Sequence, residues 1–139
     1  MKTSHQIGST ITPWVILALV LLMPAQSMAQ LLWATYYGDG LYEATEAIAV
    51  GPDGTLYATG FIQPPNWNID VFVARYSADG TQLLNHVVMD GGSIDAGFCI
   101  AVDDAGIVTV GGQTMSPDFP VTEDAVQGSY GGGMADGFL

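Results

Sequence analysis

Positive charge is almost missing from this chain of 139 residues. Its only Lys and Arg residues are Lys2 and Arg75, against fourteen Asp and Glu residues, and the formal net charge is −12 at pH 7. Proteins that bind nucleic acid neutralise phosphates with Lys and Arg side chains. An acidic chain repels phosphate backbones and anionic lipid instead. The composition therefore excludes a nucleic-acid-binding role.

Cysteine is nearly absent as well, because Cys99 is the only one. A single cysteine cannot form the intrachain disulfides that hold many small secreted domains together, so packing must stabilise the fold. Cys99 stands in the apolar run "GFCIAV", and we expect it to be a small buried residue. A hydrophobic content of 49% argues against a disordered acidic chain.

A hydrophobic run long enough to cross a membrane is also lacking. The longest, "WVILALVLLM", has ten residues between two prolines, about half of the ~20 that a bilayer requires. Lys2 precedes it, and Ser-Met-Ala stands before Gln30. This layout predicts a secretory signal peptide over residues 1–29, cleaved between Ala29 and Gln30. The alternative is an uncleaved membrane anchor.

The rest of the chain contains an internal repeat, which is the first feature to seek in such a sequence. A shift of 52 residues superimposes apolar residues and glycines over a span of thirty: Leu31-Leu32 on Leu83-Leu84, Ile48-Ala49-Val50 on Ile100-Ala101-Val102, Gly54 on Gly106, and Gly60 on Gly112. The phrase beginning at Asp70 returns at Asp136, a shift of 66, so the second unit has fourteen more residues. They fall around "SPDFPVTEDAVQGSY", whose Pro, Asp and Gly residues predict a loop.

Short β-rich runs alternate with Asp and Gly throughout the repeat. Residues 70–112 contain four of them, "DVFVARY", "QLLNHVVM", "FCIAV" and "IVTVGG". Turns are expected at Asp79-Gly80, 90–92 and 103–106, because Gly accepts the positive φ of tight turns. We therefore predict one antiparallel meander of four strands in this span, and no helix.

Three further strands are expected before Asp70, near residues 32–37, 46–50 and 55–61, and the start of another lies at the end of the chain. A four-stranded meander repeated every 40–50 residues is typical of β-propeller blades. The fold class is thus predicted to be all-β, an incomplete propeller of about two blades.

Three phrases, "DVFVARYSADGTQLL", "IAVDDAG" followed by "GGQT", and "DFPVTEDAVQGSYGGGMADGF", resemble a bacterial repeat family. This is the SBBP family, the seven-bladed β-propeller repeat, and the resemblance covers about the whole chain after the signal peptide. Gly51 and Gly137 depart from the family pattern, which has Asp and commonly Ala there. The resemblance implies a secreted or surface-exposed bacterial propeller without catalytic residues.

The repeat divides the chain into units. We expect a partial first blade of three strands over residues 30–69, a complete second blade with a long loop over 70–133, and the first strand of a truncated third blade over 134–139. Propellers typically have four to eight blades, so two cannot close a ring. The chain is therefore predicted to be the N-terminal piece of a longer protein. A two-blade unit that self-assembles into a ring is the alternative.

Few residues stand out as candidates for chemistry. His86 is the only histidine after cleavage, and we interpret it as a strand residue rather than a general base. Arg75 is expected to pair with a carboxylate rather than with an anionic ligand. A glycosidase needs two carboxylates at a set separation, which the sequence does not establish for the three glutamates, Glu43, Glu46 and Glu123.

Calcium and sugar ligands are weaker possibilities. Asp103-Asp104 and the stretch 90–95 do not match the EF-hand spacing, and Asp favours turns in any case. Several aromatic residues could form a sugar platform, although blade packing explains most of them: Trp33, Tyr36, Tyr37, Trp67 and Tyr130. Trp67, between prolines and asparagines, is the best candidate for an exposed ligand contact.

Together these features predict an exported bacterial β-propeller repeat protein, secreted or at the cell surface, that acts as a non-catalytic binding or adhesion scaffold. Its loops would contact extracellular protein or glycan, without a cofactor, a metal or a membrane after cleavage. The missing blades, or self-association, would cover its open edges. The alternative is the N-terminal part of a secreted propeller enzyme whose active site lies in other blades.

Overall fold

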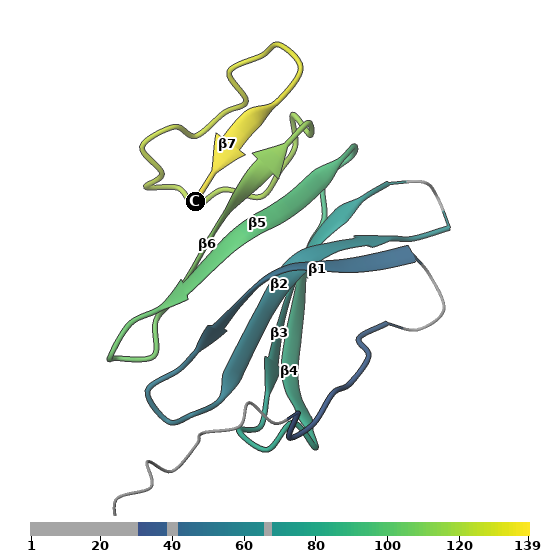
Figure 1. Cartoon of the computed structure of the whole chain (residues 1–139). Helices are drawn as coiled ribbons and strands as arrows, with labels where there is room; N and C mark the ends of the chain where they lie inside the picture. The colour runs from purple at the N-terminus through teal and green to yellow at the C-terminus, as the bar shows by residue number, and fades with distance from the viewer. Residues whose placement is uncertain (1–30, 39–41, 66–67) are drawn as a thin grey trace, which may run out of the picture. The chain divides into compact units, whose positions relative to one another are not determined.

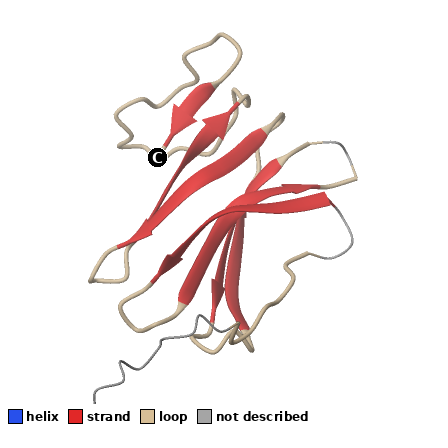
Figure 2. Cartoon of the chain, viewed as in Figure 1, coloured by secondary structure: helices blue, strands red, loops and turns tan. Residues whose placement is uncertain are grey.

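The computed structural model describes residues 31–38, 42–65 and 68–139. Within these ranges the regular secondary structure consists of β-strands alone, as Figure 2 shows, so the predicted all-β class is confirmed. In the same ranges, no helix long and apolar enough to cross a membrane is found. The predicted signal peptide, its cleavage site between Ala29 and Gln30, and Trp67 lie outside the described residues.

The first four strands form one antiparallel sheet in sequence order, which we call sheet 1 (Figure 1). Its strands are β1 (Tyr42–Val50), β2 (Leu56–Gln63), β3 (Asp70–Tyr76) and β4 (Leu83–Met89). Their alternating β-branched, aromatic and small residues suit a pleated sheet. The turn between β3 and β4 closes with a hydrogen bond from Gly80 N to Ser77 O at 2.9 Å. Gly80 has φ +69°, a conformation that favours glycine.

The last three strands form a second antiparallel sheet, sheet 2. Its strands are β5 (Asp95–Val102), β6 (Val108–Thr114) and β7 (Asp136–Phe138). The shifts of 52 and 66 residues that align the sequence also carry β1, β2 and β3 onto β5, β6 and β7. The repeat in the sequence therefore corresponds to a repeat of three consecutive antiparallel strands.

The prediction that residues 70–112 form one four-stranded meander is wrong. β3 and β4 complete the sheet that β1 and β2 begin, and the chain changes sheet between Met89 and Asp95, not at Asp70. The physical reason lies in the link between them. Asp95 N donates a hydrogen bond to Ile69 O at 2.7 Å, and Ile69 and Ile94 form a parallel bridge, so β5 starts beside the beginning of β3 rather than along β4.

Of the other expectations about turns and strands, some are confirmed and others are wrong. The turns at Asp79-Gly80 and at 103–106 are confirmed, whereas residues 90–92 connect two sheets instead of closing a hairpin. The strand expected at residues 32–37 is not formed. The final strand, β7, pairs with β6, with Phe138 opposite Gly112.

The two faces of sheet 1 are covered by different parts of the chain. Its front face carries the buried cluster Ala58, Phe72, Ala74 and Tyr76. The N-terminal segment, residues 32–38, packs on this face through Tyr37, whose ring stacks on Phe72 with centroids 4.3 Å apart. The segment thus covers apolar surface that would otherwise meet water.

The rear face of sheet 1 carries Thr59 and Val71, both fully buried. Sheet 2 lies against it through β5, where Gly97 leaves room for close approach. A Cβ atom at Gly97 would lie 2.4 Å from Thr59 Oγ1 and 3.2 Å from Val71 Cγ1. The lack of a side chain at this position therefore sets how closely the sheets pack.

The two sheets face the same way in the stack. A Cβ atom at Gly97 would also lie 3.4 Å from Val110 Cγ1, so Gly97 and Val110 share one face of sheet 2. The 52-residue shift places Val110 on Ala58, which lies on the front face of sheet 1. The front face of sheet 2 accordingly packs on the rear face of sheet 1. Successive units of the repeat are stacked front to rear.

Candidate functional site

A cavity of about 370 Å³ opens where the N-terminal segment meets sheet 1. Its wall includes three tyrosine rings and several polar side chains: Tyr36, Tyr37, Tyr76, Glu43, Thr81 and His86. Tyr36 is fully exposed. Aromatic surface with a few polar groups is typical of small-molecule sites.

His86 and Tyr37 link the two sides of this cavity. His86 lies on β4 opposite Ala74, and its Nδ1 is 3.3 Å from the hydroxyl oxygen of Tyr37. The interpretation of His86 as a strand residue is confirmed, but the residue also lines a cavity. Together the two side chains offer a hydrogen-bonding edge beside the apolar ring of Tyr37.

A buried polar network joins the start of β5 to the end of β6. Asp95, whose side chain is fully buried, accepts hydrogen bonds from Thr114 Oγ1 at 2.6 Å and from Ser116 Oγ at 2.9 Å. Ser116 Oγ in turn accepts one from Ser93 N at 2.9 Å. Every polar group in this chain of contacts has a partner, which is what burial of a carboxylate requires.

Asp70 is the less satisfied neighbour of this network. It is only 4% exposed, and its Oδ1 has no hydrogen-bond partner. Burial raises its pKa to about 6, and the charges of Asp90 and Asp95 add to the effect. An aspartate this far from its ordinary pKa is a recognised mark of a functional site, although structural clusters produce the same shift.

The repeat offers a comparison for the unpartnered Oδ1 of Asp70. Its counterpart Asp136 accepts hydrogen bonds from Gly131 N and, at 3.4 Å, from Gln127 Nε2. Both donors come from the long loop between β6 and β7, which the first unit does not have. The loop therefore supplies the second unit with donors for a carboxylate that the first unit buries without them.

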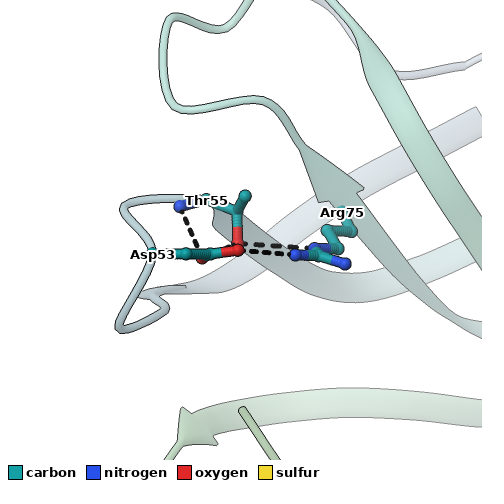
Figure 3. A network of polar contacts seen from close by, with 3 residues as sticks. All are labelled: Asp53, Thr55 and Arg75. Atoms are coloured by element: carbon teal, nitrogen blue, oxygen red, sulfur yellow. Dashed lines mark hydrogen bonds and ion pairs between the residues drawn. The ribbon is translucent and has the colours of Figure 1, made fainter. Parts of the chain in front are cut away.

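Arg75 belongs to a separate contact on β3, shown in Figure 3. Its Nη2 donates to Asp53 Oδ2 at 2.7 Å, and the Thr55 hydroxyl donates to Asp53 Oδ1 at 2.6 Å. The hydrogen bonds from Thr55, with the charge of Arg75, hold the pKa of Asp53 below its usual value. The expected pairing of Arg75 with a carboxylate is confirmed, and the pair fixes the turn between β1 and β2.

The remaining candidates are spread over the fold. Cys99 is exposed, so the expectation of burial is wrong, because it follows a bulge after Gly97 and lies on the rear face of sheet 2. Asp103 Oδ1 accepts hydrogen bonds from Ala105 N and Ile107 N within its own turn between β5 and β6, as a turn residue does. No group of three or more possible metal-binding side chains occurs in the described ranges.

The three glutamates lie in two different elements of the fold. Glu43 and Glu46 lie on β1, and Glu123 lies in the loop between β6 and β7. Among the aromatic candidates, Trp33 lies against Gly80, and Tyr130 donates a hydrogen bond to Gly133 O at 3.3 Å. Of the aromatic candidates that the structure describes, only Tyr36 and Tyr37 line the cavity on sheet 1.

No protein-family model, curated protein or solved structure matches this chain.

Sequence reasoning missed the network around Asp95. A signal was present, because Asp95 stands at the start of one β-rich run and a Thr-x-Ser pattern ends the next, at Thr114 and Ser116. In a hairpin these two positions meet across the strands, as the pairing of Asp95 with Thr114 shows. The correct pairing of β5 with β6 thus carries the network with it.

Proposed function

We propose that this chain is part of an exported bacterial β-propeller repeat protein that acts as a non-catalytic binding or adhesion scaffold. The observation that supports it best is the stacking of two repeated antiparallel sheets, front face on rear face, through Gly97 and Thr59. Propellers are built by radial repetition of antiparallel sheets, so a repeated, stacked pair of sheets supports this architecture. The signal-peptide pattern over residues 1–29 supports export.

The cavity on sheet 1 is the proposed contact region. Tyr36 presents its whole ring to solvent, and Thr81 and His86 lie in the wall of the same cavity. Tyrosine offers an apolar ring and a polar hydroxyl at small entropic cost, which suits contact with glycan or protein. The acidic composition favours neutral or cationic ligands over anionic ones.

Binding by the exported protein tests this proposal. The chain, expressed from its full sequence and recovered after export, is incubated with immobilised neutral oligosaccharides and with bacterial cells. Binding that falls at least tenfold in Tyr36→Ala supports the cavity as the contact region. The control is Tyr42→Ala, since Tyr42 is also largely exposed but does not line the cavity.

Two results would contradict the proposal. One is the absence of binding to every surface offered, and the other is turnover of an oligosaccharide by the wild-type chain. Equal loss in both tyrosine variants would reject the cavity as the contact region and leave a scaffold that binds elsewhere.

A further inference from the structure

The carboxylate of Asp70 is buried at the start of β3 with nothing to balance its charge. The residue is only 4% exposed, and its Oδ1 has no hydrogen-bond partner. On one side, β2 places the apolar Ile62 opposite it, and Glu43 on β1 lies beyond Ile62. A buried carboxylate needs hydrogen-bond donors or a cation around it, because its charge is otherwise costly to remove from water.

The neighbour of Asp70 on the other side is a second aspartate. Val71 pairs with Met89 across β3 and β4. The same antiparallel register, continued by one residue, places Asp70 opposite Asp90. Residues opposite each other point to the same face of the sheet, with Cβ atoms about 4.5–5.5 Å apart, and like charges in such a pair repel. Asp90 is exposed, so the pair has one buried member and one that solvent reaches.

The chain that follows Asp90 is held beside the start of β3. Asn68 Nδ2 donates a hydrogen bond to Gly91 O at 3.2 Å, and Ile69 N donates one to Ser93 O at 3.3 Å. The link between the two sheets therefore brings backbone carbonyl groups, as well as a carboxylate, to the region of Asp70. Carboxylates and backbone carbonyl oxygens are the protein ligands of calcium.

Further negative charge reaches this point from sheet 2. Both carboxylate oxygens of Asp95 accept hydrogen bonds from hydroxyl groups, so Asp95 is not a free ligand. Burial, with the nearby charges of Asp90 and Asp95, raises the pKa of Asp70 to about 6. The one Lys or Arg among the described residues, Arg75, pairs with Asp53 instead. The described side chains thus leave the negative charge at Asp70 without a cationic partner.

We propose that Asp70 and Asp90 are two ligands of a calcium site at the end of β4, where the chain leaves sheet 1. Calcium accepts six to eight oxygen ligands in flexible geometry, so carbonyl oxygens and water complete its shell beside only two carboxylates. This agrees with the lack of any group of three possible metal-binding side chains in the described ranges. The ion would neutralise the pair and fix the link between the sheets. The site goes beyond the proposed function and does not depend on its ligand.

Isothermal titration with CaCl₂ tests the site. The chain is expressed from its full sequence, recovered after export and stripped of cations with a chelator. At pH 7 we expect binding with a Kd of about 10⁻⁴–10⁻³ M, the range of extracellular modules. Asp70→Asn and Asp90→Asn should each weaken it roughly tenfold or more, because each removes a charged ligand. The control, Glu123→Gln, removes the same charge from an exposed loop and should change Kd by less than about twofold.

Thermal melting separates a bound ion from general screening of the net charge of −12. Calcium should raise the melting temperature of the wild-type chain, whereas the same concentration of Mg²⁺, which demands near-ideal octahedral geometry, should have a much smaller effect. In chelator, Asp70→Asn should melt above wild type, since it lacks the buried charge, and calcium should narrow this gap. Asp90→Asn changes an exposed position, so it tests the site even if Asp70→Asn disturbs the core.

Proton release is a readout that screening at the surface would not produce. Because the pKa of Asp70 is about 6, the wild-type chain holds part of a proton near that pH, and calcium must displace it. Binding should therefore be weaker at pH 6 than at pH 7.5 and should release protons at pH 6. Titrations in two buffers of different ionisation enthalpy measure the release, which Asp70→Asn should abolish.

Three outcomes would overturn the proposal. They are a wild-type chain that neither binds calcium nor gains stability from it at millimolar concentration, an equal response to calcium and Mg²⁺, and binding that both Asp70→Asn and Asp90→Asn leave unchanged. A wild-type chain that keeps its proton in the presence of calcium would assign the compensation of Asp70 to a proton shared with Asp90, which also rejects the ion.

Discussion

The hydroxyl of Thr114 donates a hydrogen bond of 2.6 Å to a carboxylate oxygen of Asp95, and neither residue is more than 5% exposed. The two residues pair across β5 and β6. The Ser116 hydroxyl donates to the other carboxylate oxygen at 2.9 Å and accepts a hydrogen bond from Ser93 N. The link between the two sheets is therefore fixed at the same point. One carboxylate thus organises the start of sheet 2.

Removing that carboxylate should cost stability. Asp95→Ala leaves the hydroxyls of Thr114 and Ser116 buried without their acceptor, so we expect the free energy of unfolding to fall by about 2–4 kcal/mol. Urea unfolding followed by circular dichroism measures it. Asp104→Ala, at an exposed turn position, is the matched control and should change stability by less than about 0.5 kcal/mol. Equal effects of the two substitutions would contradict the network's role.

Asp70 should make the protein less stable as the pH rises. Its folded-state pKa of about 6 lies above the ordinary 3.8, so the folded chain holds a proton that the unfolded chain releases between these values. Asp70→Asn removes this cost and should stabilise the protein by up to about 3 kcal/mol at pH 7. The gain should shrink below pH 6 and vanish below about pH 3.8. A gain that persists at pH 3 would rule out titration as its cause.

Asp79 provides the opposite case. Hydrogen bonds from Ser77 and Thr81 lower its pKa, so its contribution is present above pH 3.8 and lost as the pH falls through the folded-state pKa. Asp79→Asn should therefore lower the melting temperature at pH 7 and have little effect at acid pH. Parallel pH profiles for Asp70→Asn and Asp79→Asn would show that the two environments are not as described.

The pair between Arg75 and Asp53 should matter less than the buried network. Both side chains are substantially exposed, at 39% and 52%, so solvent and salt screen their attraction. Arg75→Met keeps the aliphatic contact and is expected to lower the melting temperature only slightly. Raising the salt concentration should narrow the difference from wild type. A loss as large as that of Asp95→Ala would mean that the pair fixes more than the turn between β1 and β2.

Export leaves a covalent signature. A tagged precursor expressed in a bacterium should be recovered outside the cytoplasm with Gln30 as its first residue, since the sequence predicts cleavage after Ala29. Intact-mass spectrometry distinguishes this product from the precursor. Recovery of an uncleaved chain from the membrane fraction would indicate an anchor instead.

The sequence predicted the strands better than their partners. Alternation and the Asp-Gly turns located β3, β4, β5 and β6 within a few residues, because these signals are local. The link at 90–92 has the same composition as a hairpin turn. Only the hydrogen bond from Asp95 N to Ile69 O, which joins residues 26 positions apart, shows that it leads to a new sheet.

The candidate site was harder to predict for the same reason. Tyr37 and His86 are 49 residues apart in sequence. They meet in the fold because Tyr37 stacks on Phe72 of the sheet that also contains His86. Conversely, the run around Cys99 suggested burial, but the exposure of Cys99 depends on a bulge after Gly97 that local hydrophobicity does not reveal.

The stacking of sheet 2 on the rear face of sheet 1 is the central claim, and nuclear Overhauser contacts of Gly97 test it most directly. With methyl-labelled protein, we expect cross-peaks from the Gly97 α-protons to the methyl groups of both Thr59 and Val71, because a Cβ at Gly97 would lie within 3.2 Å of both side chains. Absence of these contacts, together with backbone contacts between β4 and β5 along their length, would restore a single meander over residues 70–112 and contradict the stacked repeat.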